Sequence, residues 1–209
     1  MKIKFASFTK RPDRIRYIYE NYKDYLCDSV LDVGCDQASL KALLGDVKYT
    51  GIDIGGNPDL KIDLDNVDAL PFDDGAFNCV SCSDVLEHLD NLHMMADELV
   101  RVSGKYVIIS LPNCWCSARR PIERGKGSFA HYGLPHVKPA DRHKWFFSMT
   151  EARSFLSSFA QKHSLKIRDM HVTEKPRPVL LRALKRIRYP NQDRYLNRYA
   201  HTIWIVFEK

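Results

Sequence analysis

Long apolar runs are missing from this chain of 209 residues. The longest, 106–111, is far shorter than the roughly 20 residues that a helix needs to cross a bilayer. The N-terminal stretch 1–10 is basic, but polar side chains interrupt it, so it lacks the apolar core of a secretory signal. We therefore expect a cytoplasmic protein without transmembrane helices.

Glycine and proline are also scarce, with ten of each. Hydrophobic residues make up 44% of the chain and charged residues 28%, a balance that excludes a disordered or collagen-like protein. A chain of this length buries roughly 70% of the surface that its unfolded form exposes. We expect residues 1–209 to form a single domain.

The six cysteines include two close pairs, Cys79 with Cys82 and Cys114 with Cys116. The first pair lies in an alternating run that is typical of a strand, where positions three apart point to opposite faces. A zinc ion shared by this pair is therefore disfavoured, and we expect buried free thiols in a reducing compartment.

Charge is distributed unevenly along the chain. The net charge is +6, but residues 1–110 carry a net −7 and residues 111–209 a net +13. An acidic half suits a cationic ligand, whereas a basic half suits an anionic substrate, a membrane surface or nucleic acid. Solvated faces that happen to segregate are the alternative.

Apolar runs alternate with helical spacings, which predicts an α/β fold with a parallel, doubly wound sheet. An N-terminal helix is expected over 11–27. The other expected helices are 38–46, 86–102 and 150–163, and the expected strands are 30–34, 49–54, 60–64, 77–82, 106–111, 165–173 and 202–208.

The turn after the first expected strand carries the strongest functional signal. In such sheets the ligand lies beyond the carboxyl ends of the strands. Asp53 ends the second strand, 21 residues after Asp32, a spacing typical of the acid that binds ribose hydroxyls. Carboxylates at Asp32 and Asp36 would repel the phosphates of a dinucleotide. A cationic ligand without phosphates fits better.

Three segments, 30–35, 51–54 and 70–89, together resemble the class I S-adenosylmethionine-dependent methyltransferases, and the similarity covers about 28–113. The resemblance implies a Rossmann-like sheet of seven strands with an antiparallel last strand, and S-adenosylmethionine (SAM) as the cofactor. In the family's glycine-rich turn, Asp36 and Ala38 replace two glycines. By this resemblance, the cofactor-binding residues are Asp32, Gly34, Asp36, Asp53, Ile54, Asp63, Leu64 and Ser83.

Two histidines are the candidate catalytic residues. His88 follows the fourth strand, with Asp84 and Glu87 expected on the same helical face, and His143 precedes a later helix. In the simpler interpretation, His88 or His143 is a general base and Glu87 orients it. Asp84 can also serve only to stabilise a helix N-terminus.

A carboxylate-x-x-Glu-His pattern with a later histidine also resembles the divalent-metal site of methyltransferases acting on catechol-like quinone precursors or on the 3′-terminal ribose of small RNAs. By that resemblance Asp84, Glu87, His88 and His143 are metal ligands, and the ion lowers the pKa of the attacking oxygen. The same Leu-Glu-His pattern also occurs in related enzymes without a metal.

A basic segment is inserted at about 174–200. Within it, 179–188 has the spacing of a short amphipathic helix with Arg182, Lys185, Arg186 and Arg188. Such a helix can lie on an anionic membrane, bind acceptor phosphates, or pack on the sheet with its arginines reaching solvent. No standard RNA-binding signature is present, so nucleic acid is permitted by charge but not favoured.

The resemblance implies a SAM-dependent methyltransferase. We expect O-methylation of a small or carbohydrate-type acceptor, with sugars of surface polysaccharide synthesis as the first choice, and with peripheral attachment to the inner face of the membrane through 179–188. An RNA ribose methyltransferase is the second enzyme hypothesis. A non-catalytic scaffold that binds the cofactor and holds a partner through its basic segment is the third.

Overall fold

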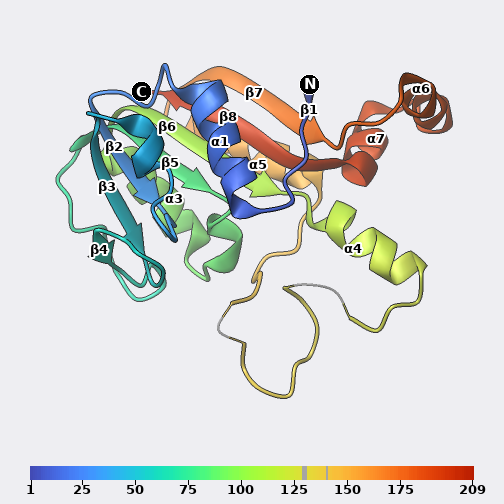
Figure 1. Cartoon of the computed structure of the whole chain (residues 1–209), viewed down its shortest axis with the longest axis horizontal. Helices are drawn as coiled ribbons and strands as arrows, with labels where there is room; N and C mark the ends of the chain where they lie inside the picture. The colour runs from blue at the N-terminus through green and yellow to red at the C-terminus, as the bar shows by residue number, and fades with distance from the viewer. Residues whose placement is uncertain (129–130, 140) are drawn as a thin grey trace.

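A single mixed sheet forms the centre of the molecule in the computed structural model, which describes residues 1–128, 131–139 and 141–209 (Figure 1). The sheet order is β1-β7-β8-β6-β5-β2-β3-β4. The strands are β1 Lys2–Phe5, β2 Ser29–Val33, β3 Lys48–Asp53, β4 Leu60–Lys61, β5 Phe77–Ser83, β6 Ser103–Pro112, β7 Lys166–Glu174 and β8 Ala200–Glu208.

Strand β8 runs antiparallel to both of its neighbours, β6 and β7, whereas the other neighbouring strands pair in parallel. The predicted mostly parallel, Rossmann-like sheet with an antiparallel last strand is therefore confirmed. The predicted strand count of seven is wrong, because β1 adds an eighth strand beside β7. This edge strand of four residues is too short for its alternation to be recognised in the sequence.

Two layers of helices cover the sheet, as Figure 1 shows. The helices are α1 Arg11–Tyr22, α2 Lys41–Leu44, α3 Leu92–Val102, α4 Cys114–Glu123, α5 Met149–Lys162, α6 Val179–Arg188 and α7 Gln192–Tyr199, with a 3-10 turn, η1, at Leu86–His88. A hydrophobic core lies on each face of the sheet, and alternate residues of β8 belong to one or the other. Trp204 packs with α1, whereas Ile205 and Phe207 pack with α3 and α5.

The long helix expected over 86–102 is broken in the structure. Strand β5 ends at Ser83, Asp84 adopts a left-handed conformation with φ of +52°, and the 3-10 turn η1 follows. Leu89 is extended, and α3 begins at Leu92. Asp84, Glu87 and His88 therefore do not share one helical face, as the spacing had suggested.

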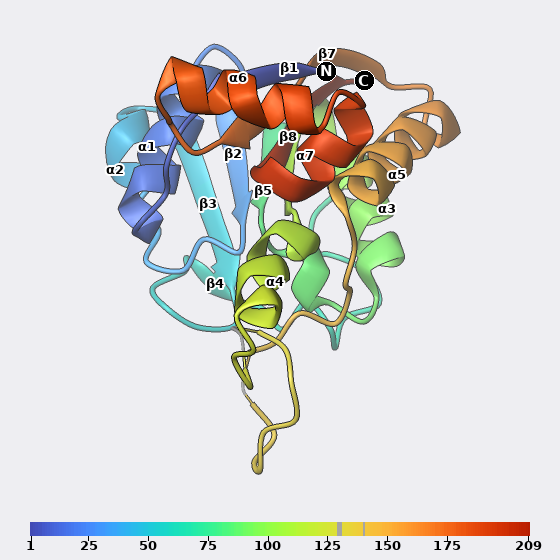
Figure 2. The same ribbon diagram turned by 90° about the vertical axis from the view of Figure 1, so that its right-hand side faces the viewer.

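Two helices escaped the sequence analysis. Helix α4 contains Pro121 within its span, which weakens the helical signal, and α7 follows the basic helix α6 after a short turn. The basic segment inserted between β7 and β8 therefore consists of two helices, not one. Helices α4, α6 and α7 lie on the same side of the molecule in Figure 2.

All six cysteines are free, and Cys79 and Cys82 belong to the cores on opposite faces of the sheet, so they cannot share an ion. Within the described part of the chain, no helix combines the length and apolarity that crossing a membrane requires.

Asn113 connects three elements at the carboxyl end of β6. Its buried side-chain amide donates hydrogen bonds to the carbonyls of Leu196, Asn197 and Ala200, at 3.2, 3.0 and 2.7 Å. Its side-chain oxygen accepts from the backbone N–H of Cys116 and caps α4. One side chain thus fixes α4 against α7 and β8.

Replacing Asn113 with alanine should lower the free energy of unfolding by about 2–4 kcal/mol, because buried carbonyls lose their donor and α4 loses its cap. Urea unfolding followed by circular dichroism measures the loss. Asn191→Ala is the matched control, since Asn191 caps α7 from an exposed position, and it should cost about 1 kcal/mol. Equal losses in the two variants would contradict the bridging role.

Candidate functional site

A cavity of about 810 Å³ opens at the carboxyl ends of β2, β3 and β5, beneath the start of α1. Its volume lies within the usual range for small-molecule and cofactor sites. All eight predicted cofactor-binding residues line it: Asp32, Gly34, Asp36, Asp53, Ile54, Asp63, Leu64 and Ser83. The structure thus brings together residues that the sequence spreads over the ends of four strands, β2 to β5, and the loops that follow them.

The turn after β2 keeps a glycine-like backbone although two of its glycines are missing. Gly34, Asp36 and Ala38 all have positive φ, at +76°, +49° and +50°. For a residue with a side chain, this left-handed conformation costs about 1–2 kcal/mol. At Gly34 a side chain is also excluded, since a Cβ atom would lie 2.2 Å from Val85 Cγ2. The contacts around the turn therefore hold Asp36 and Ala38 in a strained backbone conformation.

Asp53 holds this turn against the end of β3. Its carboxylate accepts hydrogen bonds from the backbone N–H of Asp36 at 2.8 Å and of Gly55 at 3.0 Å. The next loop packs closely on the same turn, because a Cβ on Gly56 would lie 2.2 Å from the carbonyl oxygen of Asp36. Two acceptor positions of the Asp53 carboxylate remain for a ligand.

Asp32 is buried at the floor of the cavity. The hydroxyl of Tyr49 donates to its carboxylate at 2.8 Å. Burial is the main reason why the pKa of Asp32 rises to about 7, and the nearby charge of Asp53 adds to the rise, whereas the Tyr49 hydrogen bond opposes it. A cation placed in this cavity would favour the ionised form of Asp32.

The other predicted residues line the walls. Asp63 accepts hydrogen bonds from its own loop, from the backbone N–H of Asp65 and the side chain of Asn66. Leu64 is buried, whereas Ile54 is 58% exposed at the rim. Ser83 shares a hydrogen bond of 2.8 Å with Ser110. This wall combines apolar and polar surface.

Two arginines of α1 were missed by the sequence analysis. Arg11 forms an ion pair of 2.5 Å with Asp36, and Arg14 forms one with Asp84. Both arginines line the cavity. Because the helical spacing of 11–27 indicates an apolar face but not where it docks, nothing in the sequence links these side chains to the cofactor turn.

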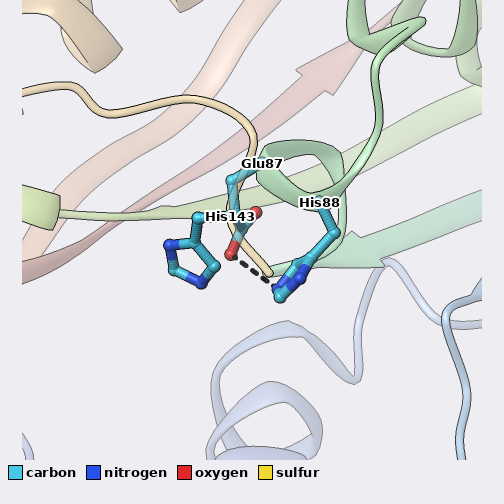
Figure 3. A group of neighbouring side chains, drawn as sticks. All are labelled: Glu87, His88 and His143. Carbon is cyan, nitrogen blue, oxygen red and sulfur yellow. Dashed lines mark ion pairs between the residues drawn. The ribbon is translucent and has the colours of Figure 1, made fainter. Parts of the chain in front are cut away.

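Glu87, His88 and His143 converge beside this cavity, as Figure 3 shows. One potential ligand atom from each residue lies within 4.8 Å of the others. Glu87 Oε1 is 3.8 Å from His88 Nε2, and the rings of His88 and His143 are 4.6 Å apart. His88 also lines the cavity itself. The predicted catalytic histidines are therefore neighbours.

The loop before α5 supplies partners that the sequence did not indicate. Asp141 lies 2.5 Å from His88 Nδ1, His131 stacks on His143 at 4.5 Å, and the hydroxyl of Tyr132 lies 2.9 Å from His143 Nδ1. This loop has no periodicity, so its contacts could not be anticipated. The Asp141 carboxylate is thus a close charged neighbour of His88, although His88 Nδ1 makes no hydrogen bond of suitable geometry among the described residues, and Nε2 lies on the side of Glu87.

Burial shifts the pKa values of Glu87 and His143 toward their uncharged forms. Glu87 is 1% exposed, and burial followed by the nearby charge of Asp84 raises its carboxyl pKa well above the usual value. The pKa of His143 falls to about 4, through burial first and then repulsion from His88 and His131. His143 is therefore uncharged at neutral pH, and burial favours the protonated form of Glu87. Glu87 Oε2 has no hydrogen-bond partner among the described residues.

Asp84 does not join this group. Its carboxylate is bound by Arg14 and accepts a hydrogen bond of 2.6 Å from Ser110. Among the described residues, the potential metal ligands that meet are Glu87, His88 and His143. Three of the four predicted ligands converge, and the fourth is turned away because the backbone leaves β5 in a left-handed conformation instead of entering a helix.

Residues 3–161 of this chain match the model of the methyltransferase domain family. The chain belongs to that family. This match and the sheet confirm the class I SAM-dependent methyltransferase that the sequence resembles, and SAM is the cofactor that the family implies. The cavity fits SAM, because it offers the buried carboxylate of Asp32 and the partly exposed carboxylates of Asp36, Asp53 and Asp63 to a cationic ligand.

Solved methyltransferase structures share the fold. The small RNA methyltransferase HEN1 has a TM-score of 0.61 at 14% identity, over 99% of this chain and 26% of that chain. The methyltransferase domain of a bacterial protein, CtHen1, gives 0.57 at 16% identity over 94% and 97%. A SAM-dependent methyltransferase from Archaeoglobus fulgidus gives 0.61 at 16% identity over 97% and 96%. At these identities the likeness is one of fold.

One curated relative is an uncharacterised protein of Methanocaldococcus jannaschii, 31% identical over 99 residues. The match covers 44% of this chain and 43% of that protein. This chain thus spans less than half of the archaeal relative and about a quarter of HEN1.

The affinity for SAM should rise with pH through about 7. Below that pH, Asp32 is protonated in the free protein, whereas a bound cation favours its ionised form. Binding then releases a proton, so the affinity falls by up to tenfold for each pH unit below about 7. Calorimetric titration between about pH 5.5 and 8.5 measures this dependence.

Two variants test the assignment to Asp32. Asp32→Asn should weaken binding and flatten the pH dependence. Tyr49→Phe should move the midpoint to higher pH, because it removes the hydrogen bond that lowers the Asp32 pKa. An unchanged midpoint in Tyr49→Phe, or a full pH dependence in Asp32→Asn, would show that another group titrates.

Proposed function

We propose that this domain transfers a methyl group from SAM to a sugar hydroxyl, with carbohydrate precursors of surface polysaccharides as the first candidate acceptors. When bound, SAM supplies an electrophilic methyl group on a sulfonium. The observation that supports an oxygen acceptor is the Asp141–His88 pair, which ends at the cofactor cavity. A hydroxyl must lose its proton during transfer, and this pair is suited to take it.

His88 is the proposed general base. Asp141 Oδ1 lies 2.5 Å from its Nδ1, and this negative charge would stabilise the imidazolium that forms when His88 accepts a proton. His143 is uncharged at neutral pH, and burial favours the protonated form of Glu87, so both residues reduce the fixed charge around Nε2. His143 then acts as a positioning residue, and His88 alone receives the proton.

A divalent cation is the second way in which the cluster can activate a hydroxyl. One carboxylate and two imidazoles are a donor set that suits a transition metal, and the unpartnered Glu87 Oε2 is consistent with a missing ligand. Glu87, His88 and His143 would hold the ion, and Asp84 would remain with Arg14. The ion would lower the pKa of the acceptor hydroxyl.

The charge near the cavity favours an acceptor with an anionic group. Lys138 and Arg142 line the cavity beside His88, and the half of the chain after residue 110 carries a net +13. A sugar that carries a phosphate would satisfy both features. Six free thiols fit a cytoplasmic location for this chemistry.

The 3′-terminal ribose of an RNA is a second candidate acceptor. Two solved structures with this fold are named HEN1 or Hen1, one of them a small RNA methyltransferase, and a ribose end also presents hydroxyls on a sugar ring. A non-catalytic scaffold is the third candidate. It predicts normal SAM affinity without turnover on any acceptor.

Incubation with SAM carrying a labelled methyl group, together with glycan, lipid-linked and RNA fractions, separates these candidates. We expect base-stable label in the glycan or lipid-linked fraction. Label confined to RNA would replace the carbohydrate acceptor with ribose. SAM binding without transfer to any fraction would support the scaffold and contradict the proposed activity.

His88→Ala should lower kcat/KM by about 10²–10⁴ without changing the SAM dissociation constant. Asp141→Asn should lower kcat with little change in KM. His136→Ala, an exposed histidine of the same loop, is the matched control and should keep full activity. Activity that survives exhaustive chelation selects the base mechanism, whereas loss that one divalent metal reverses selects the cation. Full activity of His88→Ala after chelation would contradict both.

A further inference from the structure

Helix α6 turns its charged face toward the protein. Lys185 Nζ lies 4.3 Å from the ring centre of Tyr199, and the guanidinium of Arg186 lies 3.8 Å from that of Tyr195. The guanidinium of Arg182 lies 4.2 Å from the ring of Phe5 on β1. Cation–π contacts of this kind hold the helix to the body of the domain.

The opposite face of α6 is apolar and faces solvent. Leu180, Leu184 and Ile187 follow the helical spacing of one stripe and are 72%, 55% and 77% exposed. Val179 and Leu181 add further exposed apolar surface, and no residue of α6 is buried. This orientation is the reverse of a surface helix that packs its apolar stripe inward. The stripe therefore needs a partner that the fold itself does not supply.

A second exposed apolar surface lies on α4 and α7. A cleft of about 510 Å³ lies between α4 and α7, and the exposed side chains of Trp115, Ile122 and Phe146 line it. Figure 2 shows α6, α7 and α4 on the same side of the molecule. Exposed cations accompany this surface: Arg120, Arg124, Lys175, Arg188 and Arg194.

We propose that the face formed by α4, α6 and α7 binds an anionic membrane surface. A convex helix with an outward apolar stripe suits insertion at the level of the lipid headgroups, while the surrounding cations meet anionic lipids. The guanidinium groups of Arg182 and Arg186 add to the positive potential beneath the stripe. A peptide partner would require a groove along α6, and here the helix is a ridge.

This face and the cofactor cavity lie at the same edge of the sheet. Helix α4 follows β6 and α6 follows β7, two parallel strands whose carboxyl ends meet at the edge where the cavity opens. A domain bound through this face therefore holds its active-site edge near the membrane. This consequence for acceptor access rests on the proposed function, whereas the membrane contact does not.

Sedimentation with lipid vesicles tests the contact independently of activity. The whole chain should co-sediment with vesicles containing phosphatidylglycerol at low salt, bind them less at high salt, and bind pure phosphatidylcholine weakly. Leu184→Asp/Ile187→Asp should weaken vesicle binding by about tenfold or more. Its melting temperature should not fall, because both side chains are exposed.

Leu134→Asp/Val137→Asp is the matched control. It makes the same change in charge at side chains that are 100% and 80% exposed in the loop before α5. Vesicle binding should persist in this control. Equal losses in the two double variants, or no binding of the wild-type chain to anionic vesicles, would overturn the proposal. A dimer in sedimentation equilibrium that Leu184→Asp/Ile187→Asp dissociates would also overturn it, by assigning the stripe to a second copy.

Discussion

Parallel pairing of β2, β3, β5 and β6 is the constraint on which the site depends. Since parallel strands present their carboxyl ends at one edge, residues that are far apart in sequence become neighbours there. Asp32 and Asp53 come from β2 and β3, and Ser83 ends β5. The Asp53 carboxylate then ties the end of β3 to the first turn through the Asp36 N–H. The cavity follows from this meeting of strand ends.

The edge also places two kinds of charge side by side. The buried carboxylate of Asp32 suits a cation, whereas Lys138 and Arg142 suit an anion. His88 lines the same cavity, and Asp141 Oδ1 lies 2.5 Å from its Nδ1. Acidic residues from the first half of the sequence and basic residues from the second half thus line one cavity. The uneven distribution of charge along the chain therefore contributes to this site.

Much of the architecture could be predicted from the sequence, because buried strands and amphipathic helices leave periodic patterns. The periodicity gave a wrong prediction at 86–102. The apolar spacing there is that of one helix, but the helical backbone is interrupted between His88 and Leu92. The periodicity also identified the two faces of α6 without revealing which one faces the protein. That orientation depends on the rings of Phe5, Tyr195 and Tyr199, which lie on other elements.

The candidate site was predictable to a similar extent. The eight residues proposed for the cofactor follow from motifs at strand ends, and all of them line one cavity. The contacts of Asp141 and His131 with the two histidines were not predictable, because an irregular loop brings them together. Asp84 was misplaced for a local reason, its left-handed backbone, which sequence spacing cannot express.

The atom that receives the methyl group tests the central claim most directly. Product formed with isotopically labelled SAM can be hydrolysed to its building blocks and analysed by mass spectrometry with fragmentation across the sugar ring. We predict that the label lies on a hydroxyl oxygen of a sugar, and that His88→Ala forms this product about 10²–10⁴ times more slowly. Label on nitrogen, carbon or sulfur of the acceptor would contradict it.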